Sequence, residues 1–180
     1  TEQDKILFLD TDTYFHKSPL LLFDLIQPNQ ALFYLNEGLI YNRKRFQVYI
    51  DHLEGKPIQI DSIVYELSKQ SAMWGSLMVG IMPNMRPSLD WADKLMQVFI
   101  EMVPSHTIEP FSLAESLLRK YKITEGKKYV SLYSTSRKKE HAMPIISEFL
   151  NKCQALPFDK QISLAQKVII KRSAFKVIKQ

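Results

Sequence analysis

The chain has 180 residues and a net charge of +5, from 24 lysines and arginines against 19 aspartates and glutamates. Its apolar and charged fractions, 46% and 24%, are those of an ordinary soluble globular protein of about one domain. No apolar run approaches the roughly 20 residues that a membrane-spanning helix needs. The single cysteine, Cys153, excludes an internal disulfide and favours a reducing compartment. We therefore expect a cytoplasmic protein, with peripheral membrane contact left open.

Residues 5–15 read KILFLDTDTYF and contain the most informative motif of the sequence. The apolar run Ile6–Leu9 predicts a buried strand that ends on Asp10 and Asp12. Carboxylates cost free energy to bury unless they are paired or bound to a metal, and Mg²⁺ takes one or two of them together with substrate phosphates. Open α/β sheets bind ligands at the carboxyl ends of their strands. The pair is therefore a candidate metal site, with a solvated turn as the alternative.

The remaining periodicity predicts an α/β fold with a mixed sheet flanked by helices. Arg43, Lys44 and Arg45 are interpreted as a solvated basic face. Asn36 to Gly38 is expected to form a polar turn at a strand end. After the strand over 6–9, the expected elements are a helix over 19–26, strands over 31–35 and 77–81, helices over 88–103 and from 110, a strand over 129–133 and a helix over 144–153.

Small residues precede the predicted strand over 77–81, in the order Trp74, Gly75 and Ser76. Glycine permits a ligand to approach the backbone closely, although tight strand packing explains the same pattern. Glu109 stands at the start of a predicted helix, where a carboxylate also suits the helix dipole. Both segments are candidates for ligand contact, with purely structural roles as the alternatives.

Hydroxyl and basic side chains follow the predicted strand over 129–133, and they include Arg137 and Lys138. Such a loop can hold a pyrophosphate group, or it can be a solvated surface loop. Farther along, the sequence after Asp159 contains no acidic residue, and apolar residues recur there at helical spacing. A basic amphipathic helix can lie on an anionic membrane surface or pack on its own domain. We therefore divide the chain into 1–155 and a C-terminal tail over 156–180.

Two enzyme classes use an apolar strand that ends in Asp-x-Asp. The segment Asp10 to Thr13 resembles the first motif of haloacid-dehalogenase-type phosphohydrolases, which implies Asp10 as nucleophile and Asp12 as general acid and base. That family also needs a later strand that ends in a pair of acids, and no predicted strand of this sequence ends so. The phosphohydrolase therefore stands as the runner-up.

The segment FLDTDTYFHKSPLLLFDLI is followed along the chain by LFYLNEG, MWGSLMVGI, EPFSLAESLL and YVSLYSTSRKKEHA. In this order, over about 5–150, these segments resemble the metal-binding segment and the later segments of the nucleotide-sugar glycosyltransferases of the GT-A fold. Three positions depart from the pattern, because Trp74 replaces an Asn, Pro110 replaces a Gln and Leu132 replaces a metal-binding His. The Rossmann-like half that holds the base and ribose is not within this sequence. The resemblance therefore implies the C-terminal part of such a domain.

The resemblance implies a metal-dependent transfer of a sugar from a nucleotide-diphosphate sugar to a saccharide, lipid or protein acceptor, with no nucleic acid involved. A degenerate transferase-like scaffold with a membrane- or partner-binding tail is a third alternative. The implied sites are Mn²⁺ or Mg²⁺ on Asp10, Asp12 and His141, the diphosphate on Thr11, Arg137 and Lys138, the acceptor against Trp74, Gly75 and Ser76, and Glu109 as acceptor contact or general base.

Overall fold

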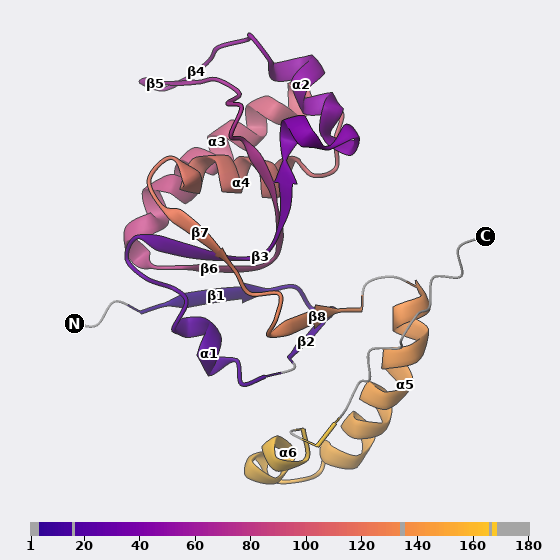
Figure 1. The fold of residues 1–180 in the computed structure, drawn as a ribbon. Coiled ribbons are helices and arrows are strands. Elements are labelled where there is room, and N and C mark those ends of the chain that lie inside the picture. Colours follow the sequence, from indigo (N-terminus) through magenta and orange to yellow (C-terminus); the bar gives the residue numbers. More distant parts are fainter. Residues whose placement is uncertain (1–3, 16, 134–135, 166, 169–180) are drawn as a thin grey trace. The chain divides into compact units, whose positions relative to one another are not determined.

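The structure, a computed structural model, describes residues 4–15, 17–133, 136–165 and 167–168 (Figure 1). The chain forms two compact units, unit 1 (Thr1–Leu132) and unit 2 (Tyr133–Gln180). The expected α/β class with a mixed sheet flanked by helices is confirmed in unit 1. Its elements are β1 (Ile6–Leu9), β2 (Thr13–Phe15), α1 (Leu20–Phe23), β3 (Gln30–Leu39), the 3₁₀ turns η1 (Ile40–Asn42) and η2 (Lys44–Phe46), α2 (Gln47–Leu53), β4 (Ile58–Ile60), β5 (Ile63–Tyr65), β6 (Ala72–Ile81), η3 (Pro83–Met85), α3 (Arg86–Met102), α4 (Ile108–Leu118), β7 (Lys122–Glu125) and β8 (Val130–Leu132).

The main sheet of unit 1 has the strand order β1-β6-β3-β7. Strand β6 runs antiparallel to both β1 and β3, and β7 runs parallel to β3. Strands β1, β3 and β7 therefore point in one direction, and their carboxyl ends lie at the same end of the sheet as the first half of β6. This is the end at which open α/β sheets bind ligands.

The pairing of β3 with β6 is irregular at that same end of the sheet. The register shifts between Phe33 and Leu35, where β6 has the longer segment, and again between Asn36 and Gly38, where Glu37 is the extra residue. The prediction of a turn at Asn36 to Gly38 is therefore wrong, because these residues continue strand β3 through a bulge. Bulges bend a strand and redirect its side chains, and they are frequent next to active sites.

Apolar side chains cover both faces of the sheet and continue into a helical layer. Leu22 and Ile26, from α1 and the turn after it, pack on one face, and α4 packs on the other. A third cluster joins α2, α3, α4 and the β4–β5 hairpin. Its centre is aromatic, because the ring centroids of Tyr49 and Phe111 are 4.3 Å apart and those of Phe99 and Phe111 are 5.7 Å apart.

Strand β1 forms as predicted, but the expectation that it is buried is wrong. It is an edge strand of the sheet, and Phe8 is 55% exposed. Helix α1 ends at Phe23, shorter than the predicted helix over 19–26. Strands β2 and β7 were not predicted, because the sequences TYF and KITE lack a continuous apolar run.

Gly80 in β6 is required by packing, and we expect Gly80→Ala to lower the free energy of unfolding by about 1–3 kcal/mol. A Cβ at this position would meet Ile26 Cδ1 at 2.6 Å and Leu32 Cβ at 2.9 Å. Gly75→Ala is the matched control, because a Cβ there meets nothing nearer than Glu37 Oε1 at 3.4 Å. Urea unfolding of both variants measures the difference, and an equal loss in the two variants would contradict this packing.

Unit 2 contains α5 (Ser136–Cys153) and α6 (Phe158–Ala165), which pack on each other. Helix α5 begins eight residues before the predicted start at 144 and has Pro144 inside it. Within the described part of the chain, no helix has the length and apolar content that crossing a membrane requires. Residues 166 and 169–180 of the basic tail lie outside the described residues, so its proposed membrane contact stays a prediction.

Candidate functional site at the carboxyl end of the sheet

The turn after β1 places Asp10 and Asp12 at the end of the sheet where the carboxyl ends of β1, β3 and β7 lie. The amide of Asp10 donates to Leu77 O at 2.9 Å, which extends the pairing of β1 with β6 by one residue. Within the turn, the Thr11 amide donates to Asp10 Oδ1 at 2.9 Å, and Thr13 Oγ1 donates to Asp10 O at 2.7 Å. These bonds fix the backbone that positions both carboxylates.

The two carboxylates differ in their surroundings. Asp10 is exposed and uses one oxygen within the turn, whereas Asp12 is half-buried. Asp12 Oδ1 is shielded from solvent and has no hydrogen-bond partner among the described residues. A carboxylate oxygen buried in this way costs free energy unless a ligand compensates for it. The turn therefore has a position where a bound cation would restore a missing interaction.

Gly75 and Ser76 lie on β6 at the same end of the sheet as the Asp10–Asp12 turn. Gly75 pairs with Leu35 of β3, and Ser76 precedes Leu77, which accepts the hydrogen bond from Asp10. These two residues, which the sequence predicts to contact the acceptor substrate, thus lie on the strand next to the one that ends at the aspartates. Both are half-buried, so each keeps some surface exposed to solvent.

Two carboxylates that the sequence analysis did not select also lie at this end of the sheet. Glu37 is the bulged residue of β3, and its Oε1 is the atom nearest to a Cβ placed on Gly75. Glu125 ends β7, and its Oε1 accepts from the Asn36 amide at 2.8 Å. A clear signal existed for Glu37, which follows a predicted strand. Glu125 had none, because β7 itself was missed.

Trp74 packs into the core and does not face the open end of the sheet. It is 7% exposed and meets Phe33 edge to face, with ring centroids 6.0 Å apart. The cluster around it includes Ala114 and Leu117 of α4. The structure therefore corrects the expectation of a direct acceptor contact, because burial leaves the indole as support for the strand that carries Gly75 and Ser76.

Glu109 lies exposed in the first turn of α4, as expected for a helix start. Its neighbour Ile108 packs in the cluster of α2 and α3, so this end of the helix lies with the helical layer. The structure does not bring Glu109 together with the Asp10–Asp12 turn. The carboxylate of α4 that reaches β6 is Glu115, because Ser71, directly before that strand, donates to Glu115 Oε2 at 2.8 Å.

The other residues implied for the diphosphate and metal belong to unit 2. His141 is exposed on α5. Arg137 and Lys138 lie in the first turn of that helix, and their side chains are outside the described residues. The structure describes unit 2 by itself, so the roles of these three residues stay predictions.

Asp10 and Asp12 suit a hard divalent cation that is shared with a phosphate ligand. In the described part of the chain, no three histidine, cysteine or acidic side chains group closely enough to hold a metal ion by themselves. Mg²⁺ is commonly held by one or two carboxylates with substrate phosphates completing its coordination. Two carboxylates, one with an unpartnered buried oxygen, fit that pattern better than they fit a closed structural metal site.

Comparison with known proteins gives no relative: no family model, no curated protein sequence and no solved structure matches the chain.

Proposed function

We propose that the chain is the metal- and acceptor-side part of a GT-A-type glycosyltransferase domain. It would transfer a sugar from a nucleotide-diphosphate sugar to an acceptor hydroxyl. The observation that carries the proposal is the buried, unpartnered Oδ1 of Asp12 at the carboxyl end of β1. The turn that contains Asp12 follows strand β1 of a mixed sheet, at the end where α/β proteins bind ligands, and this position supports the same conclusion.

The residues of unit 1 have distinct roles in this proposal. Asp10 and Asp12 would hold Mn²⁺ or Mg²⁺ from the turn after β1. A bound cation supplies positive charge that stabilises the leaving diphosphate. Gly75 and Ser76 would border the space for the transferred sugar or acceptor, because they lie on the adjacent strand and are not fully buried.

The phosphohydrolase alternative receives less support from the surrounding carboxylates. It needs a second pair of acids available for metal at the end of a later strand. Glu37 is instead held in an ion pair with Arg45, with Oε2 and Nη2 2.6 Å apart. Glu125 accepts the hydrogen bond from the backbone of Asn36. Each of these two carboxylates already has a partner within unit 1, so neither is available as the second acid pair. The transferase is therefore the better-supported hypothesis.

Calorimetric titration of UDP and of GDP, each with and without Mn²⁺, tests the proposal. The titration is run on this chain and on any longer natural form of the protein. We expect binding of one nucleotide that requires the metal and is lost in the double variant Asp10→Ala/Asp12→Ala. The physical reason is that the metal joins the carboxylates to the diphosphate.

The matched control is Asp90→Ala/Asp93→Ala, which removes two exposed carboxylates from α3 and changes the net charge equally. This control should bind the nucleotide as the wild type does. If no form of the protein binds either nucleotide with Mn²⁺ or Mg²⁺, the transferase is rejected, and a phosphohydrolase or an inactive scaffold takes its place.

A further inference from the structure

A concave surface with basic side chains lies at the bulged end of β3. We call it the basic concavity. Its volume is 770 Å³, and strand β3 together with the turns η1 and η2 forms it. Its lining residues are Leu35, Asn36, Glu37, Asn42, Arg43, Lys44 and Arg45.

The three basic residues of the concavity are in different electrostatic states. Arg45 is neutralised by Glu37, as described above, and its guanidinium lies over the Phe46 ring at 4.5 Å. Neither Arg43 nor Lys44 makes an ion pair with any described residue. The concavity therefore offers two cations that are free to bind an anion, beside a third that is held in place.

Backbone geometry at Gly38 keeps Arg43 close to the strand. Gly38 has φ +106°, a backbone conformation that residues other than glycine rarely adopt. A Cβ there would be 3.0 Å from Arg43 Nε, so the absence of a side chain leaves space for the guanidinium. Asn36 and Asn42 add amide groups around the same space. Charged and amide donors together form a site for phosphate or carboxylate.

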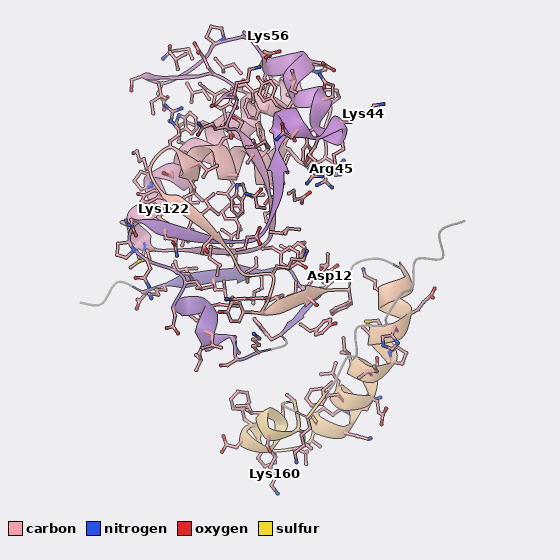
Figure 2. The ribbon with its side chains drawn as sticks, viewed as in Figure 1. Asp12, Lys44, Arg45, Lys56, Lys122 and Lys160 are labelled. Carbon is pink, nitrogen blue, oxygen red and sulfur yellow. The ribbon has the colours of Figure 1, made fainter. Side chains whose placement is uncertain are left out.

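The basic concavity is separate from the Asp10–Asp12 turn but belongs to the same end of the sheet. Strands β1 and β3 flank β6, so they are about 10 Å apart at the usual strand spacing. Figure 2 shows Arg45 and Lys44 on the same side of unit 1 as Asp12, with Arg45 the closer of the two in this view. A diphosphate on the aspartates would therefore leave the concavity available for a different part of the bound molecules.

We propose that the basic concavity binds an anionic group, a phosphate or a carboxylate, that the acceptor carries. The inference rests on the proposed function, because it places the acceptor at the Gly75–Ser76 side of the aspartates. It defines the acceptor as an acidic or phosphorylated saccharide or lipid. Arg43 and Lys44 are its specificity residues, and they position the acceptor without touching the metal.

The test measures binding of glucose 6-phosphate, glucuronate and glucose by amide chemical shifts and by calorimetry. We expect one of the two anions to bind at least ten times more tightly than glucose and to shift the amide signals of Asn36 and Asn42. Binding of glucose 6-phosphate alone identifies a phosphate as the preferred group, and binding of glucuronate alone identifies a carboxylate. Equal binding of all three sugars, or of none, overturns the proposal.

Two double variants distinguish binding at the basic concavity from a general effect of positive charge. Arg43→Gln/Lys44→Gln should weaken anion binding at least tenfold, because both free cations are removed. Lys56→Gln/Lys122→Gln removes the same charge from exposed positions elsewhere in unit 1 (Figure 2) and should have no effect. An equal loss in the two double variants overturns the proposal.

The same assay distinguishes failure of this inference from failure of the transferase proposal. Asp10→Ala/Asp12→Ala should keep anion binding at the concavity while it loses metal-dependent nucleotide binding. Anion binding without any nucleotide binding supports the concavity and rejects the transferase. Nucleotide binding without anion binding rejects only the concavity.

Discussion

Asp12→Ala is expected to make the metal-free protein more stable, by about 1 kcal/mol, and to abolish its stabilisation by Mn²⁺. The gain follows from removing a buried carboxylate oxygen that has no partner among the described residues. The loss follows from removing a metal ligand. At a free Mn²⁺ concentration one hundred times its Kd, the wild type should gain about 2.7 kcal/mol of unfolding free energy. Urea unfolding in EDTA and in Mn²⁺ measures both effects.

Asp10→Ala is the comparison that makes this result specific. Asp10 is exposed and its Oδ1 accepts the Thr11 amide, so its removal should slightly destabilise the metal-free protein. It should also remove the response to Mn²⁺. The two variants are thus expected to change metal-free stability in opposite directions and to share the loss of metal binding. A metal-free Asp12→Ala protein less stable than wild type would contradict the expected cost of the buried, unpartnered Oδ1.

The second large effect is expected at Glu115, which joins α4 to the segment before β6. The side chain is 8% exposed, and its Oε2 accepts from Tyr65 Oη at 3.0 Å and from Ser71 Oγ at 2.8 Å. Glu115→Leu leaves both donors without an acceptor. Because each unsatisfied buried group costs about 1–3 kcal/mol, we expect the two donors to cost about 2–6 kcal/mol in unfolding free energy. Glu115→Gln keeps an acceptor oxygen and should lose far less.

Glu115 also makes stability depend on pH. Burial is the main cause that raises the pKa of its carboxyl above the ordinary 4.5, against the lowering effect of the Ser71 and Tyr65 hydrogen bonds. Between pH 4.5 and the raised pKa, the folded protein therefore holds a proton on Glu115 that the unfolded chain has released. The contribution of protonated Glu115 to the free energy of unfolding is complete below pH 4.5, and it is lost as pH rises through the raised pKa.

Unfolding free energies of Glu115→Gln across this pH range test that sign. The glutamine does not ionise, so this variant should lose the decline that the wild type shows. Glu109→Gln, an exposed carboxylate of the same helix, is the matched control and should keep the decline. An identical profile for wild type and Glu115→Gln would show that Glu115 does not carry the effect.

The long periodic elements of the fold could be predicted from sequence, whereas its short strands could not. Helix α3 shows a regular apolar repeat, and β6 contains the continuous run Leu77 to Ile81. Strand β7 has the sequence KITE, and it forms because β3 provides a parallel partner. Its hydrogen bonds come from tertiary structure, which local sequence does not encode.

The candidate site was predictable only where residues were adjacent in sequence. Asp10 and Asp12 form a local motif, so the sequence was sufficient to select them. Glu37 approaches Gly75, and Glu125 reaches the Asn36 amide, only after β3, β6 and β7 have paired. Arg43 and Lys44 looked like a solvated face, because the sequence does not reveal that Gly38 and the bulge beside it shape a concavity.

Electron paramagnetic resonance of Mn²⁺ tests the central claim most directly, because the signal of free aqueous Mn²⁺ disappears when the ion binds protein. Titration of the wild type should remove the signal of one Mn²⁺ per chain, and Asp10→Ala/Asp12→Ala should leave that signal in full. Asp90→Ala/Asp93→Ala should behave as the wild type. Equal Mn²⁺ binding by the wild type and the Asp10→Ala/Asp12→Ala variant, or no binding by either with and without UDP or GDP, would contradict a metal site at the carboxyl end of β1.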